Sequence, residues 1–271
     1  MAQIVGGYGI SHTAMAIRRY DSAIPAEARI RAEFEQLQKA IEALAPDCIV
    51  MVSSEHLKTF FYDNFPQICV GLGNTCRGWG DAGVAAADVP IAGDLASYLL
   101  GFGINAGFDL SWAAEPRLDH GFMCPLTLLT PKMNIPIVPI FTNSSTAPLP
   151  PLSRYVSLGK MIKAAVESYA TTDRVVLIAA GGLSHWIATN EMGQINETFD
   201  RWFLNCVEKG DLSALAELSN ADIAVQGGNG GQEIRNWVTI MAAGSGPGKI
   251  LCYEPIQRWA TGMALARLFE K

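Results

Sequence analysis

Apolar positions recur along the chain with two different periods, which predict helices and strands in turn. Residues 25–45 carry apolar side chains three and four positions apart, on one face of a helix: Ile30, Phe34, Leu37, Ile41 and Leu44. Pro25 suits the first turn of that helix. Residues 48–52 (CIVMV) follow as a continuous apolar run rich in β-branched residues, typical of a strand covered on both faces. A helix that leads directly into a buried strand indicates an α/β fold.

The alternation continues to the end of the chain. Further strands are predicted at 135–141, 174–180 and 249–255, and further helices at 153–169, 232–243 and 256–269. The stretch 188–228 is more polar and helical. We therefore expect a single α/β domain with a central, mostly parallel sheet flanked by helices, whose ligands bind at the carboxyl ends of the strands.

Composition narrows the class of protein. The 271 residues are 49% hydrophobic and 17% charged, enough for a substantial core, and the formal net charge of -6 argues against a nucleic-acid or anionic membrane partner. No signal-peptide pattern or long apolar run is present, so we expect a cytoplasmic protein. The six cysteines form no C-x-x-C pair, which predicts reduced, mostly buried thiols.

The four histidines suggest chemistry, because each follows a predicted strand. His12, His56 and His185 end the segments IVGGYGISH, CIVMVSSEH and VVLIAAGGLSH, and His120 follows the strand-like FDLSWA. A single histidine is more often structural than functional. Four at strand ends predict convergence on one site.

The acidic candidates to join these histidines are Glu55, Asp119 and Glu233, of which Glu233 follows the glycine-rich loop QGGNGG. Two histidines and one carboxylate, with the remaining positions open, suit ferrous iron in oxygen chemistry. Zinc with a hydrolytic water uses the same ligand types. The ligand types alone leave both metals open.

The order of several motifs resembles the class III extradiol ring-cleavage dioxygenases over nearly the whole chain. The motifs are GISH, SSEHLKTFFYDNFPQICVGLG, LDHGFMCPL, PIVPIFTN followed by PLPP, GGLSHW, GGQEIRNWV and YEPIQRWATG. The resemblance implies that His12, His56 and Glu233, four residues before Trp237, bind Fe(II). It also implies that His185 is the acid/base residue and that His120 lines the substrate pocket. For Asp119 we expect one of two roles: it orients the His120 ring, as carboxylates next to functional histidines commonly do, or it is a turn or capping residue.

The resemblance further implies one catalytic domain over residues 1–271 that uses Fe(II) and O₂ for extradiol (meta) cleavage of a catechol-type ring. The expected substrate is a substituted 2,3-diol, such as a dihydroxyphenylpropionate-like or biphenyl-diol compound. An aminophenol substrate, a non-catalytic binding protein of the same fold and a zinc hydrolase are the alternatives. The chain is expected to act as a homo-oligomer or with a separate small α-subunit.

Overall fold

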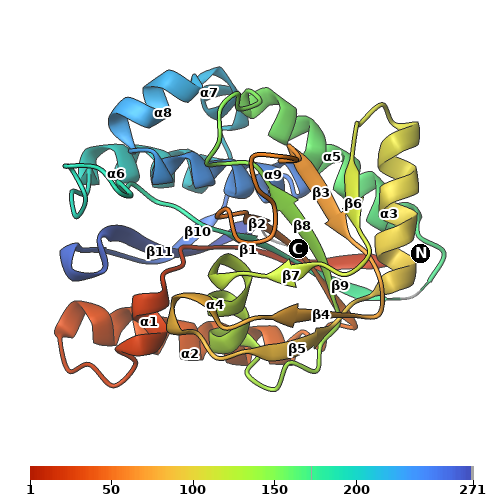
Figure 1. Cartoon of the computed structure of the whole chain (residues 1–271), viewed down its shortest axis with the longest axis horizontal. Helices are drawn as coiled ribbons and strands as arrows, with labels where there is room; N and C mark the ends of the chain where they lie inside the picture. The colour runs from red at the N-terminus through yellow and green to blue at the C-terminus, as the bar shows by residue number, and fades with distance from the viewer. Residues whose placement is uncertain (172, 270–271) are drawn as a thin grey trace.

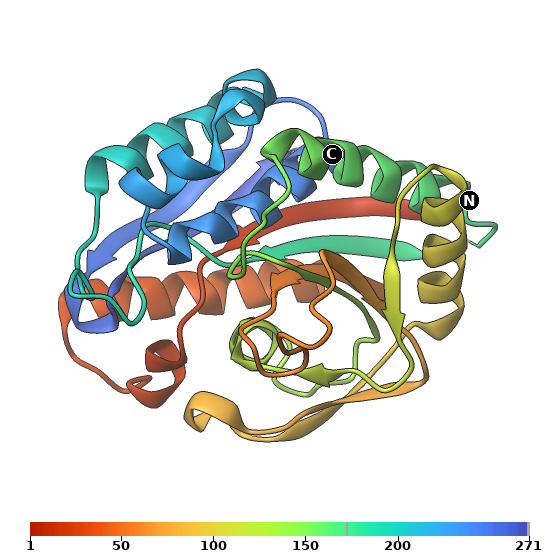
Figure 2. The same cartoon turned by 45° about the horizontal axis from the view of Figure 1, so that its top comes forward.

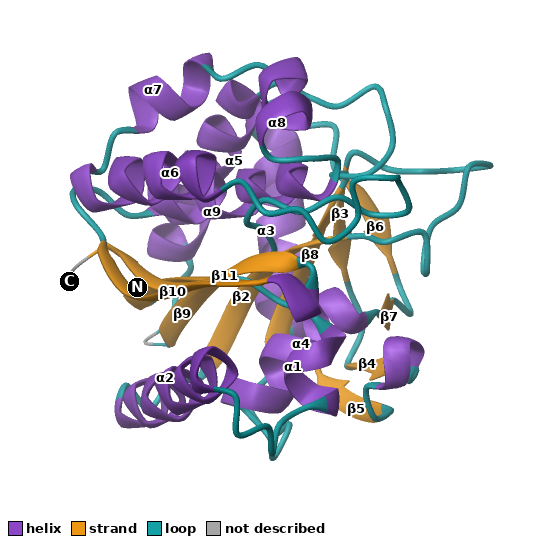
Figure 3. Cartoon of the chain, turned by 90° about the vertical axis from the view of Figure 1, so that its left-hand side faces the viewer, coloured by secondary structure: helices purple, strands orange, loops and turns teal. Residues whose placement is uncertain are grey.

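The computed structural model describes residues 1–171 and 173–269, and these form three layers with a β-sheet in the middle (Figures 1 and 3). The central sheet has eight strands in the order β10-β11-β1-β9-β2-β8-β3-β6. In chain order the strands are β1 (Gln3–Ile10), β2 (Cys48–Ser54), β3 (Ile68–Gly71), β6 (Ser111–Ala113), β8 (Ile137–Thr142), β9 (Arg174–Ala180), β10 (Lys249–Ile256) and β11 (Thr261–Phe269).

Helices cover both faces of this sheet. On one face α5 and α9 pack on the central strands, α6 packs on β10 and β11, and α7 and α8 lie farther from the sheet. Helices α1, α2 and α4 lie on the other face, and α3 lies beside β3 and β8 (Figures 1 and 3). Their bounds are α1 (Ala14–Arg18), α2 (Pro25–Ala43), α3 (Gly93–Asn105), α4 (His120–Leu129), α5 (Leu152–Ser168), α6 (Glu197–Lys209), α7 (Leu212–Glu217), α8 (Asn220–Gln226) and α9 (Ile234–Ala243).

Three further strands form a small sheet next to α4. Its order is β5-β4-β7, with bounds β4 (Thr75–Gly78), β5 (Ala87–Pro90) and β7 (Arg117–Leu118). His120 begins α4 directly after β7, not after the FDLSWA strand as the sequence suggested. FDLSWA instead contributes β6, at the edge of the large sheet. The small sheet therefore brings His120 to the site from outside the main sheet.

The centre of the sheet is parallel, as predicted. Strands β1, β9, β2 and β8 pair in parallel and in that order, and β1 and β9 run side by side across the molecule (Figure 2). Every residue of β2 is buried, which explains its continuous apolar run. The antiparallel pairs are β1–β11, β10–β11 and β3–β8.

The prediction of a helix at 256–269 is wrong. After a short turn, β11 pairs antiparallel with β1 on one side and β10 on the other. Its central residues Met263 to Ala266 are fully buried, because helices cover both faces of the sheet here. A short, continuous apolar run has no period that separates a buried strand from a buried helix, so only the pairing partners decide.

The cysteines and the apolar character of the helices bear on the predictions made from composition. All six cysteines are free and five of them are buried. Among the described residues, no helix combines the length and the apolar character needed to cross a membrane.

Candidate active site

Three neighbouring parallel strands end at the same edge of the sheet and carry the predicted residues there. His12 follows β1 by two residues and His56 follows β2 by two, while β9 runs into the Gly181–Gly182 turn that leads to His185. Because β9 lies between β1 and β2, these segments emerge side by side. The α/β topology therefore explains why residues far apart in the sequence meet.

All four histidines and Glu233 line one cavity of about 270 Å³. The ring centroids of His12 and His56 are 5.3 Å apart, and His120 lies 5.7 Å from the first and 4.3 Å from the second. One ring nitrogen from each of these three histidines lies within 4.8 Å of the others, as in a group that could hold a metal ion. This group contains His120 where the sequence analysis had expected Glu233.

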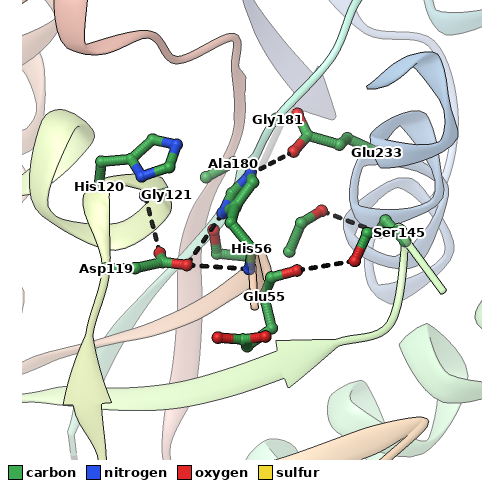
Figure 4. Close-up of polar contacts among 12 residues, drawn as sticks. Glu55, His56, Asp119, His120, Gly121, Ser145, Ala180, Gly181 and Glu233 are labelled. Atoms are coloured by element: carbon green, nitrogen blue, oxygen red, sulfur yellow. Dashed lines mark hydrogen bonds and ion pairs between the residues drawn. The ribbon is translucent and has the colours of Figure 1, made fainter. Parts of the chain in front are cut away.

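Glu233 instead meets His56 directly. Its Oε1 lies 2.8 Å from His56 Nε2, and the other ring nitrogen, Nδ1, lies 2.9 Å from Oδ2 of Asp119 (Figure 4). The backbone N–H of His56 also donates to Asp119 Oδ2, at 3.1 Å. The imidazole is thus fixed between two buried carboxylates, one of which faces the cavity.

The glycine pair after β9 is explained by Glu233. Gly181 has φ +123°, and a Cβ there would lie 2.7 Å from the Cβ of Glu233. The next residue, Gly182, donates its backbone N–H to Glu233 Oε2 at 2.7 Å. Only glycine allows this strand end to approach the carboxylate so closely.

The carboxylates of Asp119 and Glu233 favour a positive charge at or next to His56. Burial alone would lower the pKa of His56, but Asp119 and Glu233 raise it well above its usual value. Burial also opposes ionised carboxyl groups, yet the neighbouring imidazoles lower the pKa of Asp119 to about 2 and that of Glu233 below its usual range. A cation beside His56 is therefore stabilised by two ionised carboxylates.

His12 has the opposite electrostatic character. Burial lowers its pKa to about 3, so the ring is neutral near pH 7 and has a lone pair to offer. Its Nδ1 is buried without a hydrogen-bond partner in the described part of the chain. Buried polar atoms are rarely left unpaired, and metal ions bind the neutral form of imidazole. The donor set of this site therefore fits a divalent metal ion.

Of the two roles expected for Asp119, the structure shows the capping role and not the orientation of His120. Its Oδ2 holds His56, and its Oδ1 accepts from Gly121 N–H at 2.8 Å, which caps the N-terminus of α4 (Figure 4). His120 is held by Asp81 instead, with Nδ1 2.6 Å from Oδ2. Asp81 lies in the loop between β4 and β5, where no sequence pattern marked it.

Glu55, the third acidic candidate, is used for structure. Its carboxylate accepts backbone N–H bonds from Leu57, Lys58 and Thr59 at 2.6–2.7 Å. It thereby fixes the loop that follows His56. The side chain is occupied by these bonds and does not line the cavity.

His185 is held in place by the glycine-rich loop at residues 227–231. Its Nδ1 lies 2.8 Å from the Leu183 carbonyl, which can only accept, so Nδ1 carries the proton and Nε2 has the lone pair. Its backbone N–H donates to Gly227 O, and its carbonyl accepts from Gly230 N–H. A Cβ at Gly230 would collide with the imidazole ring, so this loop approaches the ring as only glycine permits.

Two side chains of helix α9 form hydrogen bonds to the ends of β2 and β9. Asn236 donates to the Ala180 carbonyl at 2.7 Å and to Ser54 Oγ at 3.0 Å. Trp237 Nε1 donates to the Gly181 carbonyl at 2.8 Å. These buried bonds fix β2 and β9 where His56 and the glycine pair emerge. The sequence analysis missed Asn236, whose only signal is an amide in a helix that is otherwise buried and mostly apolar.

Behind His185 lies a buried carboxylate that we expect to control stability between about pH 4 and pH 6. Asp200 is fully buried and accepts from Ser184 N–H and from Tyr253 Oη, each at 2.8 Å. Burial raises its pKa from 3.8 to about 6. The folded protein thus holds this proton more tightly than the unfolded chain, so its contribution to stability falls as pH rises through that window, by about 3 kcal/mol.

An Asp200→Asn variant should lack this fall, because the amide oxygen still accepts from Ser184 but does not ionise. Its free energy of unfolding, relative to wild type, should rise by about 3 kcal/mol between pH 4 and pH 6 and then level off. Urea titrations at several pH values measure this. Asp109→Asn, a change of equal charge at an exposed position, is the matched control. A pH-independent difference for Asp200→Asn would contradict the assignment.

Comparisons with known proteins agree with this geometry. Residues 6–264 match the family described as the catalytic LigB subunit of aromatic ring-opening dioxygenase. The chain is 33% identical over 289 residues to a 2,3-dihydroxyphenylpropionate/2,3-dihydroxicinnamic acid 1,2-dioxygenase of Photorhabdus laumondii, covering 88% of this chain and 89% of the relative. An enzyme of the same name from Burkholderia vietnamiensis is 29% identical, with 97% and 96% covered.

The fold has a counterpart among solved structures. An uncharacterized protein from Escherichia coli K12 superposes with a TM-score of 0.67 at 17% identity, over 97% of this chain and 98% of that one. This likeness concerns the fold alone. The family match covers nearly the whole chain, including all four histidines and Glu233. The chain therefore belongs to the LigB family of catalytic subunits of aromatic ring-opening dioxygenases, and it is an enzyme of that class.

Proposed function

We propose that residues 1–271 act as one catalytic domain that uses Fe(II) and O₂ to open a substituted catechol-type ring beside its diol. The observation that carries this proposal is that one cavity holds three suitable donors. His12 is neutral and its Nδ1 has no hydrogen-bond partner among the described residues, and His56 and Glu233 lie in direct contact beside it. Two imidazoles and a carboxylate are the donors that suit ferrous iron in oxygen chemistry. Bound Fe(II) supplies open coordination positions for both diol oxygens and for O₂.

His12, His56 and Glu233 are the proposed ligands. His56 Nε2 and Glu233 Oε1 lie 2.8 Å apart, close enough that one ion would be held by both atoms. Asp119 on His56 Nδ1 then has the position of a carboxylate that supports a metal-bound histidine. The 4.8 Å grouping of His12, His56 and His120 favours a second possibility, a three-histidine set.

The remaining two histidines act on the substrate in this proposal. His185 has its lone pair on Nε2, so it can accept a proton from a diol hydroxyl and return it later. His120 lines the same cavity, and Asp81 on its Nδ1 leaves Nε2 as the nitrogen available to the substrate. Asp81 thus fixes the orientation in which the His120 ring contacts the substrate through Nε2.

The names of the relatives support a 2,3-diol as the substrate, because they are 1,2-dioxygenases of 2,3-dihydroxyphenylpropionate. The test is to load the purified chain with Fe(II) under anaerobic conditions, add a catechol and then admit air. Oxygen uptake and a yellow ring-opened product are expected from the chain alone. Metal-free and Zn(II)-loaded protein are the controls. Iron-loaded protein that consumes no O₂ with any of a panel of catechols would contradict the proposal.

A further inference from the structure

The cavity has a polar floor and an apolar outer wall. The floor holds the four histidines and Glu233. The outer wall comes from two segments that are distant in sequence: Trp186, Ile187 and Met192 follow β9, and Trp259 and Ala260 belong to the turn between β10 and β11. Ile187 and Met192 are 44% and 64% exposed, so they lie at the rim. Whatever extends from the reacting ring toward solvent passes these side chains.

The size of the cavity leaves room for such an extension. A cavity of about 150 Å³ is sufficient for a benzene ring. The site measures about 270 Å³ and opens to solvent past Met192, so a substituent of several carbon atoms fits beside the ring. Two indoles and a thioether offer this substituent apolar, polarisable contacts.

No lysine or arginine is among the described residues that line this cavity. Three carboxylates, in contrast, belong to the site. Glu233 lines the cavity, and Asp119 and Asp81 contact the rings of His56 and His120. Bound Fe(II) would offset much of this negative charge, so the main disadvantage of an anionic substituent is that it loses part of its water without gaining a basic partner.

The arginines close to these segments are directed elsewhere. Arg258 precedes Trp259, and its Nη1 lies 3.6 Å from Glu27 Oε1, behind the wall. Arg18 is exposed and packs against Gly83, one residue beyond the lining residue Ala82. Neither lines the cavity; Arg18 lies beside a segment next to a lining residue.

We infer that the preferred substrate is a catechol-type diol with an uncharged, apolar ring substituent, such as an alkyl or aryl group, and that carboxylated side chains are disfavoured. This inference rests on the proposed function. It separates this chain from the substrates after which its relatives are named, which carry a carboxyl group on the side chain.

Three diols with a three-carbon side chain test the inference on Fe(II)-loaded enzyme: 3-propylcatechol, the amide of 3-(2,3-dihydroxyphenyl)propionic acid, and the propionate itself. The amide and the propionate have nearly the same shape and differ in charge. We expect kcat/KM to fall in that order, with the propionate at least about tenfold below 3-propylcatechol and most of the loss in KM. A propionate that equals or exceeds the neutral compounds would overturn the inference while leaving the proposed function intact. No turnover of any diol, unsubstituted catechol included, would instead contradict the proposed function.

Variants at the rim provide an independent readout. Met192→Lys adds a cation at an exposed position and should shift the ratio of kcat/KM values toward the propionate by about two- to fivefold, whereas the matched Met192→Leu should leave the ratio unchanged. An equal shift in both variants would contradict the role given to charge. If the wild type prefers the propionate and Arg18→Ala abolishes that preference, the rim supplies a cation and the inference is wrong.

Discussion

A His12→Ala variant is expected to fold and to bind no stoichiometric Fe(II). His12 is the neutral imidazole of the site, and its Nδ1 has no hydrogen-bond partner in the described chain, so removal of the ring leaves few protein groups unsatisfied. Loss of a residue that merely supports a metal ligand costs about 10–100-fold in affinity, so loss of a ligand should cost more than about 100-fold. Iron content after anaerobic loading and desalting measures this directly.

Thermal stability gives a second readout that does not depend on catalysis. A metal ion that binds only the folded state stabilises it by an amount that grows with the logarithm of its concentration divided by Kd. Fe(II) should therefore raise the Tm of wild type and leave that of His12→Ala unchanged. Retention of iron by His12→Ala would contradict its role as a ligand.

The same measurements separate the two possible ligand sets. If Glu233 completes the site, Glu233→Ala should lose the metal and His120→Ala should retain it. The reverse outcome would favour the three-histidine group, whose ring nitrogens lie within 4.8 Å of one another.

The sequence predicted the centre of the fold because local pattern and tertiary environment agree there. Strand β2 is buried throughout and its first five residues are all apolar, and α2 shows the helical period that its half-buried position requires. The prediction failed at β11, where an equally apolar segment is a strand because β1 and β10 flank it. Such pairing partners are non-local, so no local period could have indicated them.

The site, like the fold, was predicted in part. The meeting of His12, His56 and His185 followed from parallel strands that end at one edge, since topology alone brings their carboxyl ends together. Which carboxylate contacts which histidine could not be predicted, because it depends on the direction of the side chains. Asp119 precedes His120 in sequence, yet it holds His56, while Asp81, 39 residues away, holds His120. Neighbours in sequence at the start of a helix point in different directions, which a motif does not encode.

A His185→Ala variant is expected to retain Fe(II) and to lose about 10³-fold in kcat, within the range that general acid–base catalysis contributes. Its Nε2 lone pair faces a cavity shared with the proposed ligands, but its ring is held by the Leu183 carbonyl and the glycine loop rather than by a carboxylate. Removing the ring therefore removes a proton acceptor and leaves the His56–Glu233 edge in place.

Three measurements on His185→Ala together decide its role. Iron content should equal that of wild type, binding of a diol under anaerobic conditions should weaken only slightly, and kcat should carry the loss. His185→Gln is the matched control for packing, because an amide fills much of the space of the ring and cannot accept a proton at neutral pH; it should be as slow as the alanine variant. Turnover restored in the glutamine variant would indicate a role in packing. Iron loss as complete as in His12→Ala would instead mean that the fourth imidazole belongs to the metal.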